Sequence, residues 1–126
     1  MRLLLDTHTL LWALATPAKL PAPTARAIRD PANAVLVSAA SAWEIAIKVA
    51  IGKLSANVDE IVRASVAAGF DELAITLAHA VRVRTLPPHH RDPFDRMLVA
   101  QAVEEGLTVV TRDAVVARYG VSTLWG

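Results

Sequence analysis

Four carboxylates, Asp6, Glu44, Asp95 and Asp113, lie where apolar segments of this chain give way to a helix start or a loop. If these segments are neighbours in one α/β domain, the four acids meet at one edge of it. At a separation of about 5 Å and an effective dielectric constant near 20, each pair of negative charges repels by roughly 3 kcal/mol. The acids must therefore take up protons or share a hard divalent cation.

Mg²⁺ suits a site with few carboxylates because it keeps several of its own waters, and Mn²⁺ is its usual substitute. Such an ion polarises a phosphoryl oxygen and lowers the pKa of a bound water, which can then attack a phosphodiester in line. No protein nucleophile is needed. The acids thus predict a metal-dependent hydrolase of phosphodiester bonds, with one ion or two.

Each acid alone also has an ordinary explanation at a helix start. These explanations are an Asx turn or cap at Asp6, a capping box formed by Ser41 and Glu44, a favourable helix dipole at Asp95, and a cap by Asp113 on residues 114–118. Capping does not explain why all four acids fall on the same rim of a sheet. We therefore interpret the set as a site.

Length and composition indicate one folded domain, residues 1–126. The chain is 54% apolar and 20% charged, and a domain of this size buries roughly two-thirds of its unfolded surface. Without cysteine it can form no disulfide, thiolate zinc site or thiol nucleophile. A net charge of +1 is too small to argue for nucleic-acid binding from bulk charge.

The N-terminal apolar segment imitates a signal peptide, but Asp6 and His8 interrupt it. Residues 10–15 alone are far shorter than a membrane span. We therefore expect a cytoplasmic protein with no membrane association.

Short apolar strands alternate with helical patterns along the chain. The expected strands are residues 3–5, 34–38, 73–75, 107–111 and 122–125, and the expected helices cover 10–14, 24–28, 41–51, 59–68, 77–86 and 93–105. Thr7 or Thr9 is the expected cap of the first helix, and Ser41 opens the third. This alternation predicts an α/β fold with three α/β/α layers and a mostly parallel central sheet of four to five strands.

The last long helix has the clearest start signal. Asp92 fits the N-cap, Pro93 the first helical position and Asp95 the third. Because capping explains Asp92 so well, we leave it outside the metal site. Gly106 ends this helix.

The full pattern resembles the PIN-domain family and, within it, the VapC-type toxins of bacterial type II toxin–antitoxin pairs. The matching stretches are LLLDT at 3–7, SAWEI at 41–45, DRMLVAQA at 95–102 and TVVTRD at 108–113. The resemblance extends over nearly the full chain, and all four acids of the pattern are present.

The resemblance implies a PIN-like fold and a Mg²⁺-dependent endoribonuclease that is inhibited by a cognate VapB-type antitoxin and commonly forms a homodimer. By position, Asp6 and Asp95 correspond to the principal metal ligands. Glu44 and Asp113 complete the acidic site, and Thr7 or Thr111 supports it by hydrogen bonding. The resemblance does not identify the RNA that is cut.

Several basic and aromatic side chains flank these acids. Arg91, Arg96 and Arg112, with His89 and His90 before them, could grip a phosphate backbone. Ordinary surface charge, or salt bridges from Arg96 and Arg112 to the acids, explains them equally well. The two histidines have no third ligand at a useful spacing, so a transition-metal site is disfavoured.

The three tryptophans, Trp12, Trp43 and Trp125, are expected in the core rather than as platforms for stacked bases.

Three other functions compete with the nuclease. A phosphoacceptor signalling domain needs adjacent acids after its first strand and a late lysine, whereas Asp6 stands alone and no lysine follows Lys53. Phosphatases like the haloacid dehalogenases need an aspartate where this chain has His8. A non-catalytic PIN-like RNA-binding or scaffold domain would have no need of four intact acids.

Overall fold

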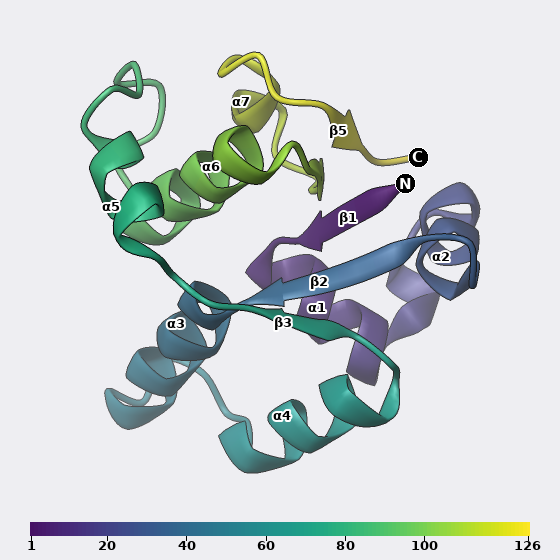
Figure 1. The fold of residues 1–126 in the computed structure, drawn as a ribbon. Helices are drawn as coiled ribbons and strands as arrows, with labels where there is room; N and C mark the ends of the chain where they lie inside the picture. Colours follow the sequence, from purple (N-terminus) through teal and green to yellow (C-terminus); the bar gives the residue numbers. More distant parts are fainter.

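A five-stranded parallel sheet with helices on both faces forms the centre of the molecule, in a computed structural model that describes residues 1–126 (Figure 1). The strands are β1 (Arg2–Leu5), β2 (Ala34–Ser38), β3 (Asp71–Leu73), β4 (Thr108–Val110) and β5 (Thr123–Leu124), in the spatial order β3-β2-β1-β4-β5. Every neighbouring pair is parallel. The predicted three-layer α/β fold is confirmed, with five strands.

Helices occupy the connections between the strands. They are α1 (Thr7–Ala15), α2 (Ala22–Arg29), α3 (Ala39–Ala50), α4 (Val58–Ala67), α5 (Leu77–Val83), α6 (Pro93–Glu105) and α7 (Ala114–Ala117), with a 3₁₀ turn η1 (Pro17–Lys19). None of them is both long enough and apolar enough to cross a membrane.

Alternate residues of the central strand β1 face two separate cores, because successive side chains of a strand point to opposite sides. Leu4 packs with residues of α6 and α7 on one face, whereas Leu3 and Leu5 pack with residues of α1 and α3 on the other. All three leucines are fully buried. The sheet is thus covered on both faces, as an apolar parallel strand requires.

Local signals located most elements to within two or three residues. The strand expected at 34–38 has those bounds, and Gly106, with a left-handed backbone (φ 66°), ends α6 as predicted. The strand expected at 73–75 lies instead at Asp71–Leu73, where Asp71 pairs with Leu36 of β2. Pairing with β2, rather than the local apolar pattern, determines where this edge strand begins.

Two predicted helix starts are wrong. Helix α1 is capped by Asp6 rather than by Thr7 or Thr9, and α3 is capped by Ser38, whose hydroxyl accepts from Ala40 N, rather than by Ser41. Both helices follow their strands without a loop, so the last polar residue before the helix is the cap. Ser41 and Glu44 consequently lie inside α3 and form no capping box.

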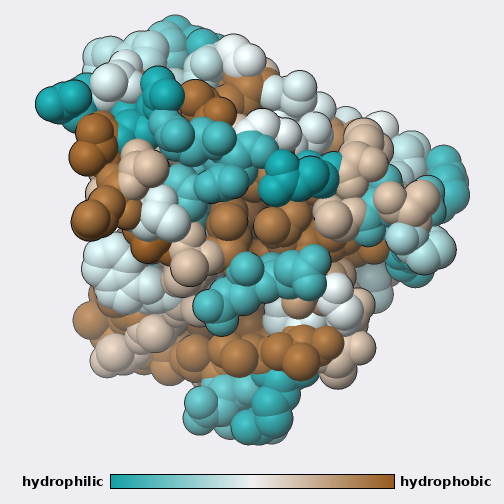
Figure 2. All heavy atoms as spheres, in the orientation of Figure 1, coloured by the Kyte–Doolittle hydropathy of each residue, from teal (hydrophilic) through white to brown (hydrophobic).

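Some apolar side chains remain on the surface. Leu77 and Val81, one turn apart on α5, are 86% and 57% exposed, and Val62 and Val66, one turn apart on α4, are also exposed. Figure 2 shows apolar side chains reaching the surface between polar ones.

Candidate metal centre

The carboxyl ends of the parallel strands place the acids on one rim of the sheet. Asp6 directly follows β1 and Asp113 lies three residues after β4. The ends of β1 and β4 are tied together by two hydrogen bonds to Val110 O, from Asp6 N at 3.2 Å and from Thr9 Oγ1 at 3.0 Å. Ligands bind at this edge of open parallel sheets.

Asp6 caps α1 through one carboxylate oxygen, Oδ1, which accepts from Thr9 N at 2.8 Å. Its side chain also lines a polar hollow of about 350 Å³ together with Asp113, Arg112 and Trp12. The capping explanation of Asp6 is therefore correct but incomplete, because the same residue lines a hollow together with a second acid.

Glu44 lies in the second turn of α3 with its side chain 8% exposed. Its carboxylate accepts a hydrogen bond from Thr7 Oγ1 at 2.7 Å and pairs with the ammonium group of Lys48. The hydrogen bond from Lys48 to Glu44 raises the pKa of Lys48. A buried carboxylate needs such partners, and none of them belongs to a helix cap.

Asp95 is the third residue of α6, and its backbone N–H donates to the N-cap Asp92 at 3.2 Å. Burial raises the pKa of Asp95 to about 6, the charges of Asp92, Glu44 and Asp6 add to this rise, and His90 opposes it. Negative charges that share one site without a cation are expected to raise one another's pKa in this way.

Asp113 caps α7 through Oδ1, which accepts from Val115 N at 2.9 Å, while Oδ2 lies 2.6 Å from Nε2 of His90. Burial acts to raise the pKa of Asp113, but the hydrogen bonds with His90 and Val115 outweigh it and lower the pKa. Thr111, which is buried, accepts from Asp113 N at 3.0 Å and so fixes the backbone that carries the acid.

His90 is the site residue that sequence reasoning missed. Its Nε2 also lies 3.8 Å from Asp95 Oδ2, and a ligand atom from each of these three residues lies within 4.8 Å of the other two. Sequence spacing alone disfavours a transition-metal site at His89 and His90, because no third ligand stands nearby. The fold instead brings His90, without His89, to Asp95 and to Asp113, which lies 23 residues further along the chain.

The aromatic neighbours of two acids join their helices. Trp43 directly precedes Glu44 and Phe94 directly precedes Asp95, and their rings pack edge to face with centroids 5.1 Å apart. Trp43 is 59% exposed, so its predicted place in the core is wrong. Trp12 and Trp125 are half-buried and pack against each other, and Trp12 lines the hollow beside Asp6.

The three arginines divide into two kinds. Arg96 donates to backbone carbonyl oxygens, including Val83 O at 3.2 Å and Pro87 O at 3.0 Å, and its guanidinium forms no salt bridge with an acid. Arg91 and Arg112 are exposed, and Arg112 lies over the Trp12 ring at 5.9 Å. The salt bridges considered for Arg96 and Arg112 are absent.

The donor set fits a hard divalent cation. Carboxylate oxygens are the ligands that Mg²⁺ and Mn²⁺ take in proteins. The carboxylates of Glu44 and Asp113 are paired with Lys48 and His90, and the pKa of Asp95 is raised by burial and, in addition, by neighbouring negative charge. A cation placed among these groups would relieve that repulsion.

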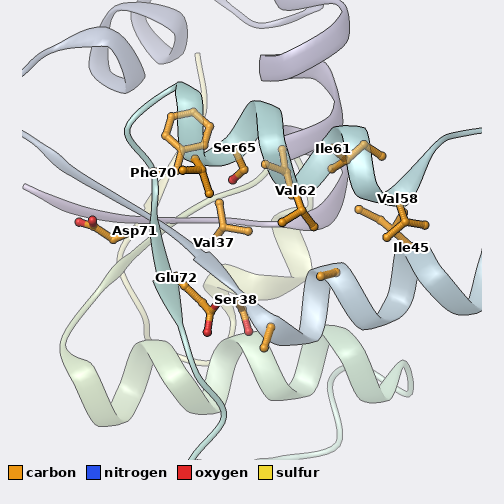
Figure 3. A pocket seen from close by; sticks show the side chains of 14 residues that line it. Val37, Ser38, Ile45, Val58, Ile61, Val62, Ser65, Phe70, Asp71 and Glu72 are labelled. Atoms are coloured by element: carbon orange, nitrogen blue, oxygen red, sulfur yellow. The ribbon is translucent and has the colours of Figure 1, made fainter.

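An apolar groove runs beside this rim, between α4 and the start of α3 (Figure 3). Its volume is about 200 Å³ and ten of its 14 lining residues are hydrophobic, among them Ile45, Ile61 and Val62. Asp71 and Glu72 of the edge strand β3 provide an acidic border. Ile45 and Glu44 are consecutive residues of α3, so the groove and the acids share one helix.

Comparison with known proteins agrees with this architecture. The sequence profile of the PIN domain matches residues 3–121. No curated protein sequence matches the chain.

Three solved structures have a similar fold. VapBC2 from Rickettsia felis bound to a promoter DNA fragment gives a TM-score of 0.75 at 13% identity, covering 100% of both chains. VapBC-1 from nontypeable Haemophilus influenzae gives a TM-score of 0.70 at 16% identity, covering 98% of this chain and 97% of that one. FitAcB from Neisseria gonorrhoeae gives a TM-score of 0.58 at 19% identity, covering 97% of this chain and 96% of that one.

Proposed function

The chain belongs to the PIN-domain family, and from this premise we propose that it is a Mg²⁺-dependent endoribonuclease, the toxin of a toxin–antitoxin pair. The observation that carries the proposal is the meeting of acids from distant parts of the chain: Asp6 and Asp113 line one hollow, and ligand atoms of Asp95, Asp113 and His90 lie within 4.8 Å of one another. The pKa of Asp95, raised to about 6 by burial and by the charges of Asp92, Glu44 and Asp6, agrees with this placement. Asp6 and Glu44, from distant parts of the sequence, thus act on one carboxyl group.

Asp6 and Asp95 are the proposed principal metal ligands, and Glu44 and Asp113 complete the acidic site. When bound, Mg²⁺ or Mn²⁺ supplies Lewis-acid activation of the scissile phosphodiester and of the attacking water. The chain's own groups orient the acids. Thr7 fixes the Glu44 carboxylate by a 2.7 Å hydrogen bond, and Thr111 fixes the backbone of Asp113.

Exposed cationic groups at the rim are suited to hold the phosphate backbone of RNA. Arg91 and Arg112 are exposed, and Arg112 lines the hollow that contains Asp6 and Asp113. Phosphate contacts position a nucleic acid without reading its sequence. The choice of RNA over DNA is supported by the resemblance to the VapC-type toxins.

Cleavage of RNA by the purified chain, freed of any partner, tests the proposal. We expect single-stranded or looped RNA to be cut with Mg²⁺ or Mn²⁺, and Asp6→Ala or Asp95→Ala to abolish cutting. Glu44→Gln should also slow cutting, because Gln cannot supply the anionic oxygen. Cleavage that persists in EDTA would refute the metal mechanism, and RNA binding without cleavage would indicate a scaffold domain.

The proposed inhibitor is a cognate VapB-type antitoxin, and the apolar groove beside α4 is where we place one of its segments. The structures of VapBC-1 and VapBC2 support such a partner. The groove is apolar with Asp71 and Glu72 at its border, so it suits an amphipathic segment with basic residues along one side. Val62→Glu should weaken co-purification of the neighbouring gene product, whereas Arg63→Glu, on an exposed position of the same helix, should not.

A homodimer and a cytoplasmic location complete the proposal. The dimer is supported by the resemblance and by the uncovered apolar pair Leu77 and Val81 on α5. Light scattering should give twice the 13.5 kDa chain mass, and Leu77→Glu should return the mass of one chain if this pair is in the contact.

A further inference from the structure

We propose that the imidazole of His90 is a nitrogen ligand of the metal centre and that it makes the centre favour Mn²⁺ over Mg²⁺. The proposal rests on the function proposed above, because it requires that the acids bind a divalent cation. It concerns a residue that carboxylate chemistry alone would not include.

The first support is the placement of the ring. His90 Nε2 lies 2.6 Å from Asp113 Oδ2 and 3.8 Å from Asp95 Oδ2. Around an octahedral ion with bonds of about 2.1 Å, adjacent ligand atoms lie about 3 Å apart and opposite ones about 4 Å. The spacing to Asp95 falls within this range, and the spacing to Asp113 needs to open by only a few tenths of an ångström.

The second support is the rigidity of the loop that carries the ring. His90 N donates to the hydroxyl of Tyr119 at 2.7 Å, and His90 O accepts from Arg96 Nη1. The same guanidinium holds Leu86 O and Pro87 O earlier in the loop. The loop is therefore tied at several points, which is how metal sites keep their ligands oriented.

The surroundings of the ring favour ligation over a simple surface contact. The side chain of His90 is 19% exposed, and its neighbour His89 packs its ring on Tyr119 at 4.9 Å between centroids. Two adjacent histidines thus have separate tasks. His89 anchors the loop on Tyr119, and His90 presents Nε2 to two carboxylates.

The chemical consequence is a preference among metals. Mg²⁺ binds oxygen ligands and rarely nitrogen, whereas Mn²⁺ and later first-row metals accept imidazole readily. A site of carboxylates with one imidazole should therefore bind Mn²⁺ more tightly than Mg²⁺. Removing the imidazole should bring the two affinities closer together.

Electron spin-echo spectroscopy of the Mn²⁺-loaded protein tests this directly, because it detects a nitrogen atom bonded to the ion. We expect nitrogen coupling in the unaltered protein and its loss in His90→Asn. The affinity of His90→Asn for Mn²⁺, measured by titration, should fall by roughly tenfold or more, and its affinity for Mg²⁺ by less.

The chain offers matched controls in its other histidines. His89→Asn removes the adjacent imidazole, and His8→Asn removes the one that lines the hollow with Asp6. Both variants should keep the nitrogen coupling and the Mn²⁺ affinity. The measurement on the unaltered protein does not depend on whether any variant folds.

The possible failures are distinguishable. Mn²⁺ binding without nitrogen coupling would overturn ligation by His90 and leave the carboxylate centre intact. Coupling that survives in His90→Asn but disappears in His8→Asn would also overturn it. If no Mn²⁺ binds at all, the proposed metal-dependent function fails together with this inference.

Discussion

Lys48 and Glu44 form an ion pair across one turn of α3, directly at the acidic rim. The side chain of Glu44 is nearly buried and that of Lys48 is 43% exposed. The hydrogen bond to Glu44 raises the pKa of Lys48, so the lysine is charged at neutral pH. The rim therefore includes its own cation beside an acid that we assign to the metal centre.

Lys48→Met should have opposite effects on stability and on metal binding. Without metal, the free energy of unfolding should fall by about 1 kcal/mol, because the nearly buried carboxylate loses its cation. Mn²⁺ should bind several-fold more tightly, because Lys48 no longer competes for Glu44. Urea unfolding in EDTA and Mn²⁺ titration measure the two effects.

Lys53→Met is the matched control for this variant. Lys53 is an exposed lysine just beyond the same helix, and its side chain forms no ion pair. Lys53→Met should leave the free energy of unfolding and the affinity for Mn²⁺ unchanged. Weaker Mn²⁺ binding in Lys48→Met would show that the lysine supports the metal rather than competing with it.

Asp95→Asn should stabilise the metal-free protein at neutral pH although it abolishes cleavage. The native state holds the Asp95 proton up to about pH 6, whereas the unfolded chain releases it near 3.8. The native state thus binds more protons in this window, so wild-type stability falls as the pH rises from about 4 to about 6. Above pH 6 the variant should be more stable by about 1 to 3 kcal/mol.

Urea unfolding in EDTA at pH 4 and pH 7.5 separates this effect from a simple loss of packing. The free energies of unfolding of the wild type and of Asp95→Asn should be nearly equal at pH 4 and should differ at pH 7.5. Asp92→Asn is a useful comparison, because it keeps the N-cap of α6 through an Asn side chain while removing a charge that raises the pKa of Asp95. A difference that is the same at both pH values would contradict the electrostatic explanation.

Local patterns in the sequence were sufficient for most of the fold. Asp92, Pro93 and Asp95 occupy the N-cap, first and third positions of α6 as expected, because each position has its own backbone requirement. The capping box at Ser41 and Glu44 failed because Ser38, three residues earlier, provides an equally good cap where the strand ends. A spacing rule cannot rank two caps that compete for one helix.

Tertiary contacts explain what the sequence could not provide. His90 meets Asp113 across 23 residues of sequence, and only the packing of α6 and α7 on β4 brings them together. The apolar setting of Trp43 in the sequence predicts a place in the core, yet its side chain is exposed and its ring packs on Phe94. The resemblance to a known family predicts a role for the acids but none for the imidazole beside them.

Thr7→Val should weaken the site through Glu44. Thr7 donates to a nearly buried carboxylate, and a hydrogen bond to a charged group contributes about 1.5 to 3 kcal/mol. We expect a loss of this size in the free energy of unfolding and RNA cleavage slower by about tenfold or more. Thr7→Ser keeps the hydroxyl group and should retain most of the stability and most of the RNA-cleaving activity.

Thr9→Val is the control that separates a general loss of stability from the loss of the hydrogen bond to Glu44. Thr9 is on the same helix and donates to the backbone oxygen of Val110, without contact to a carboxylate oxygen through its hydroxyl. It should lose stability by about 1 kcal/mol and lose less activity than Thr7→Val. Equal losses of activity in the two variants would mean that Thr7 acts only through folding.

Replacing Arg96 by alanine should lower stability, whereas replacing Arg112 by alanine should weaken RNA binding. Arg96 donates to the carbonyls of Val83, Leu86 and Pro87, so Arg96→Ala leaves several acceptors without a donor. The free energy of unfolding should fall by about 2 kcal/mol or more. Arg96→Lys should rescue little, because an ammonium group cannot reproduce the planar fork of donors.

Arg112→Ala should leave unfolding almost unchanged and weaken RNA binding instead. If its guanidinium contacts one phosphate, the slope of log affinity against log salt concentration should become shallower by about 0.7. The same change is expected for Arg91→Ala, since its side chain is also exposed and directly follows His90 in the sequence. A salt slope unaffected by either variant, with stability also unaffected, would mean that the RNA follows another path to the acids.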